Sequence, residues 1–89
     1  MRAVITVIGK DMVGILAKVA GVCARHNANV IEVTQSVLQE LFAMIMLVDI
    51  ADLGVPFDQF AAALEQLGQE MGLSVHVMHE DIFNSMHRI

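Results

Sequence analysis

The stretch "LFAMIMLVDI", residues 41–50, decides how the chain folds. Its apolar run from Leu41 to Val48 is the longest in the sequence, and it is far shorter than the roughly 18 to 20 residues of a membrane-spanning helix. Successive side chains of a strand point to opposite faces of a sheet, so a run that is apolar at odd and even positions predicts a strand covered on both faces. Residues 41–50 are therefore predicted to lie in the middle of a sheet.

The segments before this strand alternate between strand and helix patterns. Residues 2–8, "RAVITVI", are β-branched and apolar, which favours a buried strand that ends at Gly9. Residues 12–26 repeat apolar side chains at intervals of three and four, which predicts an amphipathic helix, and the asparagines of "HNAN" favour its end. Residues 29–39 then alternate Ile31 and Val33 with Glu32 and Thr34, as in a half-buried strand, and "QE" at 39 and 40 is a turn signal.

The segments after it repeat the pattern. Gly54 and Pro56 interrupt the chain before apolar residues at helical spacing from Phe57 to Met71, and Gly72 favours the end of that helix. Residues 73–80, "LSVHVMHE", predict a last short strand, and residues 81–89 predict one or two further helical turns. The predicted order is strand, helix, strand, strand, helix, strand and a helical tail.

That order predicts an α+β, ferredoxin-like sandwich in which residues 1–89 form one domain. Right-handed crossovers leave few ways to build it other than a four-stranded antiparallel sheet with both helices on one face. The first and third strands are then central. One sheet face has no helix over it although the third strand is apolar on both sides, so we expect the tail, a partner chain or both to cover that face.

Composition limits what the chain can bind. Of the 89 residues, 56% are hydrophobic, which is more than a small monomer buries, so we expect a homodimer or a larger oligomer. A formal net charge of −5 with no Tyr or Trp argues against direct nucleic-acid binding. The N-terminus lacks the long apolar segment of a signal peptide, and the single cysteine, Cys23, cannot form an internal disulfide. We therefore expect a cytoplasmic protein that does not associate with membranes.

The turn within "VIGKDMVGIL", residues 8–17, is a candidate ligand site. If a helix starts at about Met12 with Asp11 at or next to its N-cap, the N–H groups of its first turn can bind a small carboxylate. Asp11 could then face an ammonium group, and Gly14, inside the first helical turn, would let a ligand or a partner chain come close. On spacing alone, the favoured reading is structural: Gly9 turns the chain and Asp11 caps the helix without any ligand.

The same segments resemble a known family. The strand "AVITVIGKD", the turn "GKDMVGIL", the second strand "ANVIEVTQSVL" and the tail "EDIFNSMHRI" together resemble ACT domains, small modules that commonly bind amino acids and pair with one another. The resemblance covers nearly the whole chain. It is closest to an uncharacterised family of stand-alone single-ACT proteins and more distant to the ACT pair of the glycine cleavage transcriptional repressor.

The resemblance implies a ligand site between two chains. In ACT domains that bind amino acids, the ligand usually lies between the first strand-to-helix turn of one chain and the start of the second strand of the other. The matching positions are Gly9, Lys10, Asp11, Met12, Val13, Gly14, Ile15 and Leu16 on one side, and Asn29, Val30 and Ile31 on the other. Because no catalytic or DNA-binding domain is attached in this sequence, a regulated enzyme or regulator would be a separate partner.

Two histidine-containing pairs could carry other chemistry. Cys23 and His26 are three apart on the apolar side of the predicted helix, which favours a buried structural thiol over a nucleophile or a metal ligand. His76 and His79 are three apart in a strand and would point to opposite faces, so they are not expected to share a metal ion, with or without His87. No catalytic residue, cofactor or metal site is predicted.

Two functions remain as hypotheses. The first is a non-enzymatic regulatory module that binds an amino acid or a similar small molecule at a homodimer interface. The second is a structural adaptor that docks another protein through its dimer surface without a small ligand, which the apolar surplus favours. Loss of amino-acid binding in Asp11→Ala would support the first, and a partner that still binds Asp11→Ala without amino acid would support the second.

Overall fold

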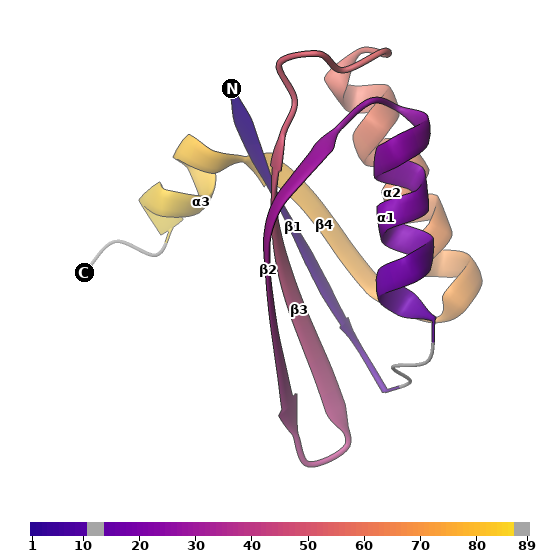
Figure 1. Cartoon of the computed structure of the whole chain (residues 1–89). Coiled ribbons are helices and arrows are strands. Elements are labelled where there is room, and N and C mark those ends of the chain that lie inside the picture. Colours follow the sequence, from indigo (N-terminus) through magenta and orange to yellow (C-terminus); the bar gives the residue numbers. More distant parts are fainter. Residues whose placement is uncertain (11–13, 87–89) are drawn as a thin grey trace.

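A four-stranded antiparallel sheet with two helices on one face forms the main body of the molecule (Figure 1). The computed structural model describes residues 1–10 and 14–86, apart from the side chain of Leu38. Helices α1 and α2 lie on one side of the sheet, and the short α3 lies on the other (Figure 1). This is the predicted ferredoxin-like arrangement with its helical tail. The elements in chain order are β1 (Arg2–Gly9), α1 (Ile15–Arg25), β2 (Asn29–Leu38), β3 (Leu41–Asp49), α2 (Phe57–Met71), β4 (Ser74–His79) and α3 (Glu80–Met86).

The strand order β2-β3-β1-β4 confirms that the first and third strands are central. In the β1–β3 register, Arg2 lies opposite Asp49 and Gly9 lies opposite Phe42, so the two strands are paired along their whole length. Strands β2 and β3 are joined by the predicted turn at residues 39 and 40, where Gln39 has a φ of 55°. Positive φ angles are usual in such two-residue hairpin loops because they match the twist of the strands.

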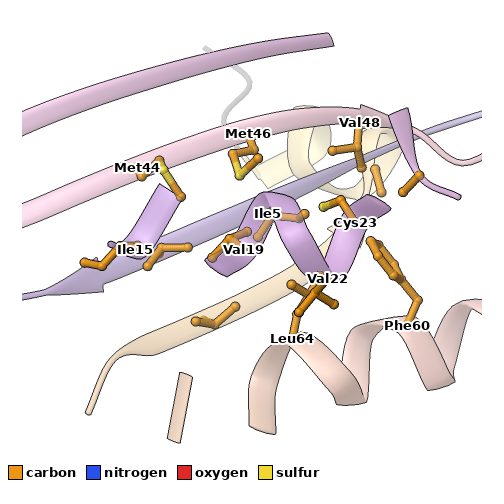
Figure 2. Close-up of a cluster of buried hydrophobic side chains, with 14 of the residues drawn as sticks. Ile5, Ile15, Val19, Val22, Cys23, Met44, Met46, Val48, Phe60 and Leu64 are labelled. Atoms are coloured by element: carbon orange, nitrogen blue, oxygen red, sulfur yellow. The ribbon is translucent and has the colours of Figure 1, made fainter. Parts of the chain in front are cut away.

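The hydrophobic core lies between the sheet and the pair α1 and α2. Figure 2 shows Ile5, Met44, Met46 and Val48 of the sheet lying in one cluster with buried side chains of the two helices. Full burial of a side chain of this size stabilises the fold by about 1.5 to 3 kcal/mol. The largest fully buried side chains are Phe60, Ile5, Ile15, Met44, Met46, Leu64, Val7, Val19, Val48 and Cys23.

The opposite sheet face, here called the open face, carries no long helix. Part of it is covered by α3, whose Phe83 and Met86 line a hollow above β1, β3 and β4. The tail therefore covers part of the sheet face that has no helix over it in the predicted four-stranded fold, as expected. Apolar side chains remain exposed there, including Ile8 at 48% and Ile45 at 42%. The middle of the open face on β1, β3 and β4 consists of Val4, Thr6, Ile8, Leu41, Ala43, Ile45, Leu47, Ser74, His76 and Met78, and the charged Arg2, Glu32 and Asp49 lie toward one end of the same face.

Two details of the predicted strands are wrong. The alternation that placed Ile31 with Val33 fails because the β2–β3 register shifts between Val30 and Glu32. Such a bulge inserts one residue, so Val30 and Val33 pack against the core while Ile31 is 47% exposed. The last strand is also shorter than predicted, because Glu80 begins α3 instead of ending β4.

Candidate functional site

The candidate turn begins where β1 ends. Gly9 is buried against Leu73, and a Cβ atom at Gly9 would overlap with the Leu73 side chain, so the glycine has a packing role there. Lys10 follows and is exposed. The predicted site residues Asp11, Met12 and Val13 lie outside the residues that the structure describes. The described turn therefore consists of its two ends, Gly9 and Lys10 on one side and Gly14 on the other.

Gly14 corrects the predicted start of the first helix. The helix begins at Ile15, and Gly14 is its N-cap with φ 76° and ψ 0°, so neither a start at Met12 nor an N-cap at Asp11 holds. The left-handed region costs an L-residue roughly 1 to 2 kcal/mol, which glycine avoids. A Cβ atom at Gly14 would meet nothing within 4 Å, so within the described chain its conformation and not a close approach explains the glycine.

The first turn of α1 presents backbone donors. The first helical hydrogen bond runs from the Lys18 N–H to the Gly14 carbonyl at 3.0 Å, and the N–H groups of residues 15–17 precede it. No described side chain caps this end, and no acidic residue lies in the first turn. The N–H groups of a first helical turn and the positive end of the helix dipole favour a negative charge at such a position. The side chain of Ile15 is only 1% exposed and belongs to the core, whereas Leu16 is 39% exposed.

A hollow that the sequence did not indicate lies next to this turn. It has a volume of about 350 Å³. Its position follows from the register, because pairing of Gly9 with Phe42 places the β2–β3 turn beside the residue after β1. No spacing in the sequence could have shown this, since it depends on which residues of two distant strands pair. The lining residues are Lys10, Val37, Gln39, Glu40, Leu41 and Phe42.

The second half of the predicted site lies at the other end of the sheet. Asn29 pairs with Asp49, which pairs in turn with Arg2 at the start of β1, whereas the turn follows Gly9 at its end. Strand β1 has 8 residues, about 23 Å at 3.3 Å per residue. Asn29 and Ile31 are exposed, and Val30 packs partly against the core. One chain therefore does not bring the two halves of the predicted site together.

The Cys23 thiol is part of the core. It is 0% exposed, and burial raises its pKa to about 11, only partly offset by a hydrogen bond to the backbone. A thiol that is buried and protonated at neutral pH is a poor nucleophile, which supports the structural role favoured from the sequence. The ring of His26 contacts Phe60 edge to face, with 6.0 Å between ring centroids.

The other two described histidines point to opposite faces, as predicted. His79 stacks on Phe57 with ring centroids 4.1 Å apart, and His76 lies on the open face with Nε2 at 3.4 Å from the Ser74 hydroxyl oxygen. His87 lies outside the described residues. In residues 1–10 and 14–86, no three His, Cys, Asp or Glu side chains gather as metal ligands would. That same part of the chain contains no helix with the length and apolar character required to cross a membrane.

Known proteins with similar sequences or structures match most or nearly all of this chain. A family model for the ACT domain matches residues 2–78. The UPF0237 protein of Methanopyrus kandleri is 47% identical over 88 residues, which cover 99% of this chain and 98% of the relative. An ACT domain protein from Streptococcus pneumoniae has a similar structure, with a TM-score of 0.81 and 35% identity over 93% of each chain.

A more distant match has the same fold. A candidate glycine cleavage system transcriptional repressor matches with a TM-score of 0.71 and 26% identity, over 85% of this chain and 43% of that protein. ACT domains are typically regulatory modules that bind small ligands. The family model, the full-length relative and the matching structures agree, and the chain belongs to the ACT domain family.

Proposed function

We propose that the chain is a non-enzymatic regulatory module that binds an amino acid, or a similar small zwitterion, at the interface of a homodimer. The observation that carries this proposal is the start of α1, where Gly14 is the N-cap and no described side chain satisfies the first-turn N–H groups. Family membership supports a ligand in this class. The proposed site consists of the turn from Gly9 to Leu16 of one chain and Asn29 to Ile31 of the other.

The carboxylate of the ligand would bind at the start of α1. Residues 15–17 supply backbone donors, and an anion there gains from the helix dipole without needing a cationic side chain. The exposed Lys10, at the other end of the turn, would add positive charge to the site. This local donor set can attract an anion even though the chain has a net charge of −5, because charges beyond about 10 Å are screened at physiological salt.

Two chains are needed because the two halves of the site lie at opposite ends of the sheet. A two-fold axis perpendicular to the strands would make them run in opposite directions in the two chains, which would bring the Gly9 end of one chain beside the Asn29 end of the other. The exposed Asn29 amide could then bind the polar end of the ligand, and Asp11 is our proposed acceptor for its ammonium group. A ligand shared in this way stabilises the dimer, and dimer stability is the signal that a regulated partner could sense.

Screening against single amino acids tests the proposal. A ligand present at 100 times its Kd adds about 2.7 kcal/mol to the free energy of unfolding, which raises Tm by roughly 10 °C or more for a chain of this size. We expect calorimetry to show binding that Asp11→Ala and Asn29→Ala each weaken about tenfold or more, because each loses a hydrogen bond to a charged group. Lys18→Ala, an exposed lysine on the same helix, is the control and should bind as wild type.

Mixing the two weakened variants tests whether the site is shared. A heterodimer of Asp11→Ala and Asn29→Ala contains one site with both changes and one site with neither. Random pairing of equal amounts should therefore restore about a quarter of the wild-type sites. A wild type that binds no amino acid would refute the ligand, and binding that mixing does not restore would refute a site shared between two chains.

A further inference from the structure

We infer that α3 is a hinged lid over the open face, held shut while Arg2 binds Glu80 and released when Arg2 turns to Asp49 of β3. The inference does not rest on amino-acid binding. It starts from α3 itself, which has 7 residues and no buried side chain, whereas α1 and α2 each bury apolar side chains. Isolated helices shorter than about 12 residues are marginal in water, so the position of α3 depends on its contacts with the sheet.

The contacts of α3 with the sheet are uneven along the helix. Val4 is only 4% exposed, although Ile8 on the same strand and face is 48% exposed. Helix α3 contacts β1 and β4 and is bound at Arg2, two residues before Val4 on the same face, so its start covers Val4. Phe83 and Met86, farther along the helix, line a hollow of about 490 Å³ over β1, β3 and β4. The helix therefore lies close to the sheet where it begins and stands away from it farther along (Figure 1).

The hinge of this lid lies between His79 and Glu80. Strand β4 ends at His79 and α3 begins at Glu80, with no loop between them. His79 pairs with Ala3 in the sheet, and its ring stacks on Phe57 of α2 with 4.1 Å between ring centroids. These contacts fix the end of β4 to the side of the sheet that carries α1 and α2. A movement of α3 then needs only a change in the backbone angles between His79 and Glu80.

The latch of the lid is the ion pair between Arg2 and Glu80. The guanidinium makes two contacts with the carboxylate, Nε to Oε1 at 2.9 Å and Nη2 to Oε2 at 2.7 Å. The two side chains are 48% and 24% exposed, so water competes for both partners. The pair borders a hollow of about 550 Å³ that also reaches Met1, His79 and Asp81, which leaves the guanidinium room to move. An ion pair this exposed changes an open-to-closed ratio by up to about fivefold.

Asp49 offers Arg2 a second partner. The β1–β3 register places Asp49 directly opposite Arg2 on the same face. Residues opposite each other on antiparallel strands have Cβ atoms about 4.5 to 5.5 Å apart, which is within reach of a long side chain. Asp49 Oδ1 accepts the Ala51 N–H at 2.8 Å, and the other carboxylate oxygen can accept from a guanidinium. Release of Glu80 therefore exchanges one ion pair for another, and Arg2 keeps a carboxylate partner in both states.

Opening of the lid would change the surface of the molecule more than its fold. None of the side chains of the hydrophobic core between the sheet and α1 and α2 belongs to α3, so that core stays packed when α3 moves. On the other face, Val4 and its β4 neighbour Met78 would lose their cover. The state of the latch would therefore set how much apolar surface the open face exposes, by a local opening of the kind that elements with few buried contacts undergo.

Neutralising the two carboxylates separately tests the switch, because the inference gives them opposite effects. Glu80→Gln removes the latch and should raise the open-to-closed ratio by up to about fivefold, whereas Asp49→Asn removes the competing partner and should lower it. Asparagine keeps an oxygen that can accept the Ala51 N–H, so this strand end should stay folded. Glu65→Gln, which neutralises an exposed carboxylate on α2, is the control and should leave the ratio unchanged.

Hydrogen exchange of α3 amides measures the ratio. The N–H groups of residues 84–86 are those that a helix starting at Glu80 bonds internally. Their exchange should be fastest in Glu80→Gln, intermediate in wild type and slowest in Asp49→Asn, while β1 and β3 amides keep their rates. The Val4 and Met78 methyl signals should move in opposite directions in the two variants. Rates that change in the same direction in both variants, or in neither, would overturn the switch. Wild-type α3 amides that exchange as slowly as those of β3 would overturn the lid.

Discussion

The two faces of the sheet carry similar types of residue, but these residues have different surroundings. In β3, Met44 and Met46 point toward α1 and α2 and are 1% and 0% exposed, whereas Leu41 and Ile45 point the other way and are 47% and 42% exposed. All four side chains are large and apolar. One face is covered by two helices of 11 and 15 residues, and the other by a helix of 7 residues.

This difference shows that an apolar residue has a different role on each face. On the covered face, apolar side chains stabilise the single chain, because their burial is complete within it. On the open face the same residue types leave apolar surface in contact with water, which is unfavourable until something covers it. The first face should therefore respond to substitution in folding experiments, and the second in assembly experiments.

The largest effect should come from Phe60→Ala on the covered face. Phe60 is 0% exposed, and removing such a side chain typically costs 3 to 5 kcal/mol because it leaves a cavity. Ile45→Ala should cost less than about 1 kcal/mol in dilute protein, and more at concentrations where chains assemble. Urea denaturation over a range of protein concentrations measures both. Equal costs for the two substitutions in dilute protein would contradict the difference between the faces.

Alkaline pH should lower the free energy of unfolding because of Cys23, whose thiol is buried in the core. An unfolded thiol ionises near its ordinary pKa of 9.0, whereas the buried thiol keeps its proton until about pH 11. The free energy of unfolding should therefore fall as pH rises from 9 to 11, by about 2 to 3 kcal/mol for a shift of this size. Denaturation of wild type and Cys23→Ala across this range isolates the thiol, and identical pH slopes in the two proteins would count against this interpretation.

A smaller effect is expected where α2 packs on β4. A Cβ atom at Gly68 would lie 2.5 Å from Val75 Cγ2 and 3.1 Å from the Leu73 carbonyl oxygen. Gly68→Ala should therefore push the helix from the sheet and cost about 1 to 3 kcal/mol. Gly21→Ala is the matched control, because a Cβ atom at Gly21 in α1 meets nothing within 4 Å. It should stabilise the chain by up to about 1 kcal/mol. Equal results for the two variants would refute the packing argument.

The smallest effect should be that of the Arg2–Glu80 pair, which fixes α3 over the open face. The two side chains are 48% and 24% exposed, and pairs of this kind contribute about 0.2 to 1 kcal/mol. A double-mutant cycle of Arg2→Ala and Glu80→Ala should give a coupling energy in that range that falls with added salt. Hydrogen exchange of the α3 amides should become faster in either variant. A coupling above about 2 kcal/mol would mean that α3 is part of the folding core.

Periodicity alone predicted most of the fold. The apolar run of β3 placed it in the centre, and the spacing of Phe57 to Met71 gave α2 its observed bounds. The repeating hydrophobic pattern failed at positions where the backbone conformation of a single residue interrupts the repeat. The bulge at Ile31 and the left-handed Gly14 each depend on a single backbone conformation that a repeating pattern does not show.

The candidate site was less predictable than the fold. The turn was found because glycines near a strand-to-helix junction are visible in the sequence, but the hollow beside Lys10 depends on the pairing of Gly9 with Phe42. The position of Asn29 at the other end of the sheet likewise follows from register. How two chains meet is a property of their surfaces, and a sequence pattern of one chain does not contain it.

Amide chemical shifts measured during titration with the amino acid that screening identifies test the central claim most directly. We predict that signals of Gly9, Lys10, Gly14 and Leu16 shift together with those of Asn29 to Ile31, although the two groups lie at opposite ends of the sheet in one chain. Signals of the open face, such as Ile8 and Ile45, should stay unchanged. Shifts confined to the open face, or to one of the two groups alone, would contradict an amino-acid site shared between two chains.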